Sequence, residues 1–226
     1  MDKKRVFLKG VKASLPVMIG YVPIAISFGV VAESYHFPPL FPVLMSLSVF
    51  AGASQFMAIG MLGNGIPIVQ IVLATLVINS RHFIMGFSLL PCLENISVPK
   101  KAMCFLGLTD ETFAIISLSE DAEMRTETAI YGLILCAFGA WCLGTYAGVK
   151  ASGLIPACLK SAMNIALYAM FIALLVPALL KKQKYLPVVI LAVMLNVIVR
   201  QVLPEGWALV VATVVSPAIF PLLKRT

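Results

Sequence analysis

The stretch from Leu186 to Val199 reads LPVVILAVMLNVIV. Its apolar residues do not alternate with polar ones, whereas a membrane β-strand of roughly 10 residues alternates between lipid-facing and lumen-facing positions. The stretch therefore predicts a helix. Similar apolar runs recur along nearly the whole chain, separated by short polar breaks, and the fold class that we expect is all-α.

The composition indicates that lipid surrounds these helices. Of the 226 residues, 61% are hydrophobic and 12% are charged, whereas soluble globular domains are about 45–50% apolar and about 25% charged. A domain of this size exposes too much surface to hide the surplus in a core. We therefore predict a single polytopic membrane helix bundle over residues 1–226.

A crossing helix needs about 20 mostly apolar residues to cover a hydrocarbon core of about 30 Å. Such runs predict about seven to eight spans, at approximately 13–32, 40–62, 66–90, 102–118, 129–149, 161–180, 185–203 and 206–223. The first run exceeds the roughly 7–15 apolar residues of a signal peptide and contains Pro16 and Pro23, so we expect it to stay in the protein as a helix. Gly63-Asn64-Gly65 predicts a turn between antiparallel neighbours.

Lysine and arginine residues near the span ends predict the orientation, because they accumulate on the cytoplasmic side. Eight spans would place the basic segment 1–12, the 181–184 loop and the C-terminal residues in the cytoplasm. Four lysines would then lie outside, which a re-entrant segment or a count of seven spans would resolve: Lys100, Lys101, Lys150 and Lys160. The net charge of +7 is thus a topology signal, and no nucleic-acid partner is expected.

Four charged or titratable residues lie deep inside predicted spans, far from the span ends: Arg81, His82, Asp110 and Glu111. A charge at a helix centre costs about 2.5–3.5 kcal/mol on insertion scales, so such groups usually face protein or water. Arg81 and Asp110 are each about 14–15 Å of helix from the loop between them, which predicts an ion pair of Arg81 with Asp110 or Glu111. Such a pair either marks a functional site or only holds two helices together, and His82 also suits a proton relay.

Neutral polar residues extend this cluster. Gly52 either lets two helices approach closely or breaks a helix and exposes backbone groups. Gln55 needs a hydrogen-bond partner inside its apolar run. Ser54, Asn79 and Asn164 are further donors and acceptors that lipid would not accept freely.

Motifs for catalysis or for a cofactor are lacking in the sequence. The five cysteines are odd in number and form no C-x-x-C pair, so we predict neither a zinc site nor a disulfide framework. H-E-x-x-H, G-x-S-x-G and the G-x-x-x-x-G-K-[ST] phosphate loop do not occur. The expectation is a non-enzyme without a metal or other cofactor.

A weak echo links residues 20–29 to residues 139–148, each with a glycine at both ends. Secondary transporters are often built from internal repeats and broken helices, with the binding site at the repeat interface. Small-residue patterns such as the G-x-x-x-G at 144–148 also arise from helix packing alone. Both explanations remain open.

The polar blocks resemble those of AzlC-type proteins: FAGASQF at 50–56, NSRH at 79–82 and LTDETFA at 108–114. GYVP at 20–23 and AMFIALLVP at 169–177 are similar to further blocks of that family. The resemblance implies the large subunit of a secondary carrier that exports branched-chain amino acids across the bacterial plasma membrane. Its substrates would be valine, leucine, isoleucine and analogues such as azaleucine.

The resemblance further implies a small AzlD-type membrane subunit as partner, and it adds Thr112 to the candidate site. Family members often carry an aspartate where this chain has Asn164, which puts the coupling mechanism in doubt.

The leading hypothesis is a proton-coupled exporter of small apolar amino acids. We expect Gly52, Ser54 and Gln55 to bind the zwitterionic head. Arg81 would attract the carboxylate, and Asp110 or Glu111 would attract the ammonium or carry the proton. The alternative is a non-transporting membrane scaffold whose buried charges only hold helices together.

Overall fold

The computed structural model describes residues 2–93, 96–156 and 183–203, with scattered positions between 172 and 219. Every regular element within these residues is helical, which confirms the predicted all-α class. Most of the predicted spans 161–180 and 206–223, together with Asn164, lies outside the described residues.

Three helices of the described part are long and apolar enough to cross a membrane. They are α1 (Lys3–Ser34), α4 (Ile68–Leu89) and α7 (Glu127–Ala151), the last continued by the short turn η3 (Ser152–Leu154). The Asp2 side chain caps α1 by accepting a hydrogen bond from the backbone N–H of Lys4 at 3.0 Å. The basic N-terminal residues are therefore the first turns of α1, and Pro16 and Pro23 lie inside this helix without ending it.

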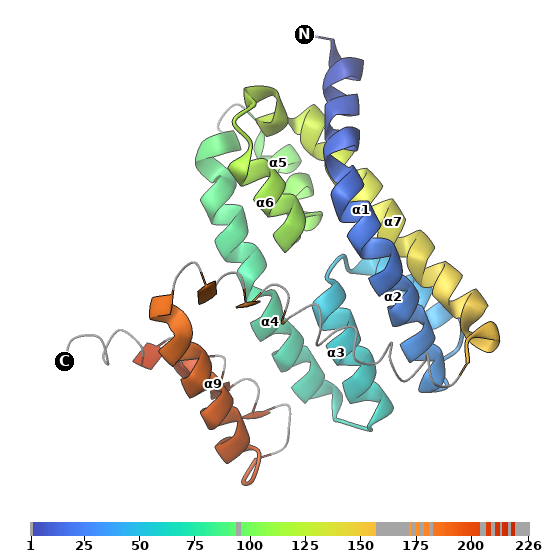
Figure 1. The fold of residues 1–226 in the computed structure, drawn as a ribbon, viewed down its shortest axis with the longest axis vertical. Helices are drawn as coiled ribbons and strands as arrows, with labels where there is room; N and C mark the ends of the chain where they lie inside the picture. The colour runs from blue at the N-terminus through green and yellow to red at the C-terminus, as the bar shows by residue number, and fades with distance from the viewer. Residues whose placement is uncertain are drawn as a thin grey trace.

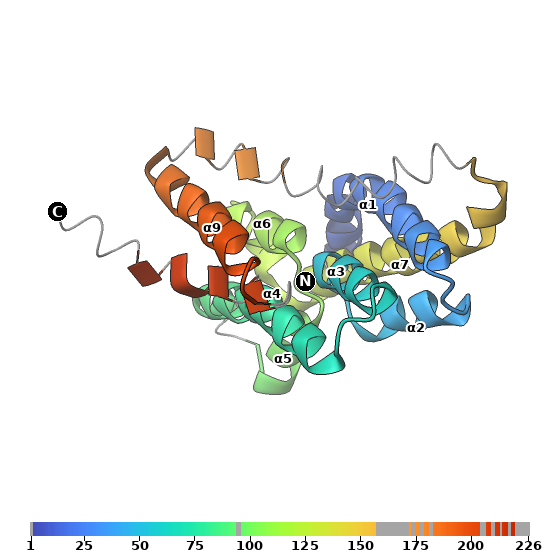
Figure 2. The ribbon, with the colours of Figure 1, turned by 90° about the horizontal axis from the view of Figure 1, so that it is seen from below.

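Helices α1 and α7 run side by side in the same direction (Figures 1 and 2). Their backbones touch, because a Cβ atom added to Gly29 would lie 2.4 Å from the carbonyl oxygen of Thr145, and one added to Gly148 would lie 2.2 Å from that of Ile26. The two segments of the sequence echo are thus packed against each other. Close packing accounts for the small residues that they share.

The predicted span 40–62 is wrong, because the chain turns back halfway. Helix α2 (Leu40–Ser48) begins just beyond the end of α1, and α3 (Gly52–Gly63) ends with Gly63 against the Tyr35 ring at that same end of α1. With 9 and 12 residues, the two helices extend about 13 and 18 Å, well short of the hydrocarbon thickness. Together they form a re-entrant hairpin, which we call the first hairpin.

The predicted span 102–118 is wrong for the same reason. Helix α5 (Val98–Leu106) begins where Lys100 Nζ contacts Glu127 Oε1 at 2.8 Å, beside the start of α7. Helix α6 (Asp110–Leu118) leads to the turn η2 (Ala122–Arg125) beside the start of α1, where Lys9 Nζ lies 2.7 Å from Asp121 Oδ2. These helices form the second hairpin, which enters from the side opposite to the first.

The two hairpins change the topology. Within residues 2–93 and 96–156, only α1, α4 and α7 are long and apolar enough to cross a membrane, and the second hairpin returns to the side on which α1 begins. Lys100 and Lys101 therefore lie on the same side as the basic N-terminus, as the positive-inside pattern requires. A re-entrant segment thus resolves their conflict with the eight-span arrangement.

The remaining elements complete the description. Gly65 has a φ of +71° in the turn between α3 and α4, which confirms the predicted turn. The turn η1 (Leu90–Leu93) follows α4, and η4 (Gln183–Tyr185) precedes α9 (Leu186–Val199). The opening sequence stretch is thus a helix, and it lies on the side of α4 away from α1 (Figures 1 and 2).

Candidate functional site

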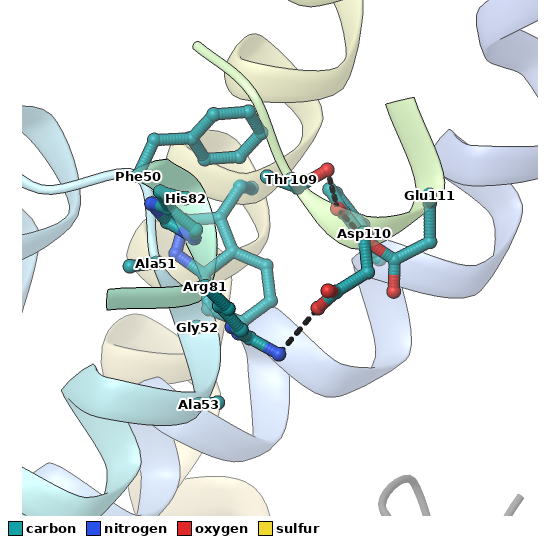
Figure 3. Close-up of a pocket in the computed structure, with 11 residues that line it drawn as sticks. Phe50, Ala51, Gly52, Ala53, Arg81, His82, Thr109, Asp110 and Glu111 are labelled. Carbon is teal, nitrogen blue, oxygen red and sulfur yellow. Dashed lines mark hydrogen bonds and ion pairs between the residues drawn. The ribbon is translucent and has the colours of Figure 1, made fainter. Parts of the chain in front are cut away.

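The tips of the two hairpins meet at a pocket between the long helices. Its cavity of about 30 Å³ has room for one or two water molecules. The lining residues come from both tips and from the interior of α1, α4 and α7: Tyr21, Phe50, Ala51, Gly52, Ala53, Arg81, His82, Thr109, Asp110, Glu111 and Trp141 (Figure 3). Two interrupted helices and three long ones therefore build one site.

An ion pair spans this pocket. Arg81 Nη1 of α4 lies 2.5 Å from Asp110 Oδ2 at the start of α6, and the two side chains are 32% and 33% exposed (Figure 3). This is the pair that the depths of the two residues predicted. Bringing the charges together lowers the cost of placing each of them in the membrane.

Two nitrogen atoms beside the ion pair lack hydrogen bonds within the described residues. Arg81 Nε and His82 Nε2 are buried and unpaired, and both residues line the pocket. A buried donor or acceptor without a partner is costly. The pocket therefore has polar capacity that the protein's own side chains do not satisfy.

The second hairpin brings a capped helix start to the pocket. The Thr109 hydroxyl accepts a hydrogen bond from the backbone N–H of Thr112, whose own hydroxyl accepts one from the N–H of Thr109 at 2.8 Å. The Tyr21 hydroxyl of α1 donates to Glu111 Oε2 at 2.6 Å and lies 2.7 Å from Thr109 Oγ1. The start of α6 thus presents two carboxylates, and its capping box satisfies the N–H groups of Thr109 and Thr112.

The first hairpin brings an uncapped helix start to the pocket. Ala51, the N-cap residue of α3, supplies no side-chain hydrogen bond, and Gly52 and Ala53 of the first turn line the cavity. The amide groups of a helix N-terminus carry a partial positive charge and bind anions. This tip therefore offers backbone donors where the other offers carboxylates.

Aromatic rings form the apolar part of the pocket. The Tyr21 ring packs edge-on against Phe50 and Trp141, with centroids 5.9 and 5.5 Å away. Figure 3 shows Phe50 on the side of the pocket opposite Asp110 and Glu111. Opposite charges next to an aromatic wall suit a zwitterion with an apolar side chain.

Half of the predicted site residues line the pocket and four lie behind it. Gly52, Arg81, His82, Asp110 and Glu111 are lining residues, whereas Ser54, Gln55, Asn79 and Thr112 are not. Asn79 Nδ2 donates to Ser54 Oγ at 3.1 Å and joins α4 to α3. Gln55 has the partners that its apolar setting demanded, with Trp141 Nε1 2.7 Å from Oε1 and Ser46 Oγ 3.2 Å from Nε2.

Sequence reasoning missed the other lining residues. Tyr21 and Thr109 lie in blocks that carried the family resemblance, and Thr109 also begins a T-x-x-T helix-start pattern. Nothing in the sequence marks Trp141 as a lining residue, since an aromatic residue in an apolar helix usually packs in a core. No group of three or more histidine, cysteine, aspartate or glutamate side chains in the described residues could hold a metal ion.

Charged side chains gather where α1 begins and the second hairpin ends. Arg5 Nη2 contacts Glu123 Oε1 at 2.5 Å, and Lys9 pairs with both Asp121 and Glu123; we call these four residues the N-terminal ion cluster. The hydrogen bond from the Lys9 ammonium lowers the pKa of the Asp121 and Glu123 carboxyls. The cluster ties the end of the second hairpin to α1.

Comparisons with known proteins identify the family and several relatives of this chain. The family model described as AzlC protein matches residues 16–155. The inner membrane protein YgaZ of Escherichia coli is 33% identical over 184 residues, which cover 78% of this chain and 75% of the relative. An uncharacterized membrane protein of Archaeoglobus fulgidus is 32% identical over 181 residues, covering 79% and 78%.

A third relative has a name that states its role. The branched-chain amino acid transport protein AzlC of Bacillus subtilis is 24% identical over 176 residues, covering 76% of this chain and 67% of the relative. No solved structure matches the chain.

Proposed function

The chain belongs to the AzlC protein family, and on that premise we propose that it is a secondary transporter that exports branched-chain amino acids. The observation that carries the proposal is the meeting of two helix breaks at a pocket that holds an ion pair. Secondary transporters bind their substrates at such discontinuous helices near the membrane midplane. The name of the Bacillus subtilis relative supports the substrate class.

The two hairpin tips divide recognition of the zwitterion. The substrate carboxylate lies against the uncapped start of α3 and the Arg81 guanidinium, both of which favour an anion. The ammonium lies against Asp110 and Glu111. The substrate thus replaces the ion pair in which Arg81 and Asp110 lie 2.5 Å apart, because its carboxylate pairs with Arg81 and its ammonium with Asp110. Its side chain lies against the aromatic wall.

The structure of the pocket fits a closed state of this transporter. A cavity of about 30 Å³ holds at most one or two water molecules, so an amino acid enters only when the hairpin tips separate. Because the hairpins open to opposite sides, movement of one or the other exposes the site to one side of the membrane at a time. Alternating access requires this property.

The coupling ion, the partner and the location complete the proposal. Asp110, Glu111 and His82 are titratable pocket groups suited to carry a proton. A small AzlD-type membrane subunit packs on the apolar exterior of the helices. The membrane is the bacterial plasma membrane, with the N-terminal ion cluster on the cytoplasmic side, because lysine and arginine accumulate there.

The test is efflux of labelled valine from cells that express the chain with its partner. Arg81→Ala should lower efflux by at least about tenfold, since a charge-assisted contact of about 1.5–3 kcal/mol is lost, while the inserted protein stays measurable by immunoblot. The matched control is Arg125→Ala, at an exposed arginine beyond the pocket. Normal efflux by Arg81→Ala, or no valine flux from the wild type in proteoliposomes, would leave the scaffold role as the better explanation.

A further inference from the structure

A buried row of hydrogen-bonded polar side chains leads away from the pocket. Trp141 Nε1 donates to Gln55 Oε1 at 2.7 Å, Gln55 Nε2 donates to Ser46 Oγ at 3.2 Å, and Ser46 Oγ lies 2.9 Å from Thr145 Oγ1. None of the four side chains is more than 3% exposed. This row of hydrogen bonds joins both helices of the first hairpin to α7 and ends at the Trp141 indole.

The Trp141 ring is held on every side. Its N–H is fixed by Gln55, while its far edge abuts the hairpin tip, because a Cβ atom added to Gly52 would lie 2.5 Å from Trp141 Cη2. Tyr21 packs edge-on against the ring at 5.5 Å, and Phe28 stacks on it at 6.4 Å. The indole cannot tilt without losing its hydrogen bond or colliding with a neighbour.

We infer that Trp141 sets the largest side chain that the pocket accepts, and that Gln55 is the positioning residue that holds the ring in place. The inference rests on the proposed function, since it assigns the limit on the size of the transported amino acid. Trp141 lines the cavity beside Gly52. A phenyl ring there would leave space next to the hairpin tip, and removal of the Gln55 acceptor would free the indole to turn.

The experiment measures selectivity with the full chain and its partner in proteoliposomes. Unlabelled valine, methionine or phenylalanine competes with labelled valine in the wild type, Trp141→Phe, Gln55→Leu and the double variant. Both single variants should raise the potency of phenylalanine as a competitor, relative to that of valine, roughly tenfold. This is the lower end of the range for one added group in an apolar pocket. The double variant should show no more than the larger single effect, because both changes break one interaction.

Matched controls are Trp207→Phe and Gln201→Leu, at exposed positions far along the sequence; they should keep the wild-type ratio. Trp207→Phe also leaves Trp141 as the sole tryptophan, since the chain has two. Its fluorescence should then change as valine is added.

The outcomes separate this inference from the proposed function. Uniformly weaker transport with an unchanged phenylalanine-to-valine ratio would overturn the assignment of Trp141. The assignment would also be overturned if Trp207→Phe transports valine and its Trp141 fluorescence stays constant as valine is added. This measurement remains possible if Trp141→Phe fails to insert. Absence of amino acid flux in the wild type would instead refute the proposed function.

Discussion

The two re-entrant hairpins share an architecture and differ in the chemistry of their tips. Each consists of two short helices with a break at the pocket. The first starts its returning helix without a side-chain cap and with no charge at Gly52 and Ala53, whereas the second starts with the Thr109 cap and two carboxylates. In the proposed transporter this difference would let one pocket bind both ends of a zwitterion, because one tip supplies backbone donors and the other supplies acceptors.

The hairpins are also anchored differently. Neutral hydrogen bonds join the first hairpin to α7 near its tip, through Ser46 and Gln55. Ion pairs join the second hairpin to α1 and α7 at its open end, through Asp121 and Lys100. The first hairpin is therefore held to α7 beside the pocket, whereas the second is held at its open end and also at its tip, through Tyr21 and Arg81.

The largest expected effect concerns the sides on which the hairpins open. Single cysteines at His36 and Asn64, in a chain without its five native cysteines, should react with an impermeant maleimide from one side. Cysteines at Ser97 and Ala122 should react only from the opposite side, which is the side of the N-terminus. Eight simple crossings would instead place positions 36 and 64 on different sides, and labelling in that pattern would refute the re-entrant arrangement.

The next effect compares the glycines that let each tip pack. Gly52→Ala should reduce valine transport roughly 5- to 150-fold, because overpacking costs about 1–3 kcal/mol and the Trp141 ring beside it is fixed. Trp141→Phe should restore much of the loss. Gly107→Ala, whose Cβ would lie 2.2 Å from Ile134 Cγ2, should lower the melting temperature and keep transport per inserted molecule, since Ile134 is not a lining residue.

Comparable losses of transport from both glycine variants, without rescue by Trp141→Phe, would remove the distinction between the tips.

A smaller effect tests the cap that separates the two helix starts. Thr109→Ala should destabilise the protein by about 1 kcal/mol, the usual value of an N-cap, and Thr109→Ser should keep most of that stability. Thermal unfolding in detergent measures both. The converse change, Ala51→Ser, gives α3 a cap and should raise the apparent KM for valine, because the new hydroxyl competes for the same amides. An unchanged KM would argue against carboxylate binding there.

Much of the site, but little of the hairpin architecture, could be predicted from the sequence. The predicted pair of Arg81 with Asp110 or Glu111 is present with Asp110. The residue count gives the right depth because α5 starts at the loop, as the prediction assumed. Hydropathy cannot distinguish a helix that crosses from two half-length helices that turn back, since both are equally apolar. The cap at Thr109 was a visible sign of the second break, whereas contact between Gly52 and Trp141 depends on tertiary packing alone.

The smallest effect concerns the N-terminal ion cluster. Because the pKa of Asp121 and of Glu123 is lowered in the folded protein, their contribution to stability is present above their ordinary pKa. It is lost as pH falls through the lowered value, below about pH 4. Lys9→Gln should flatten the fall in melting temperature in that range, and Lys12→Gln, an exposed lysine of the same helix, should not. Identical pH curves for both variants would contradict the assignment.

The contact between α1 and α7 limits which parts of the molecule can move. Carbonyl oxygens of each helix lie where a side chain of the other would begin, at Gly29 and Gly148. A slide of one helix along the other by about one turn would put Ala25 or Glu33, four residues away on the same face, in the place of Gly29, where a Cβ atom has no space. The pair therefore acts as a fixed frame, and in the proposed transporter the gating motion belongs to the two hairpins that pack against it.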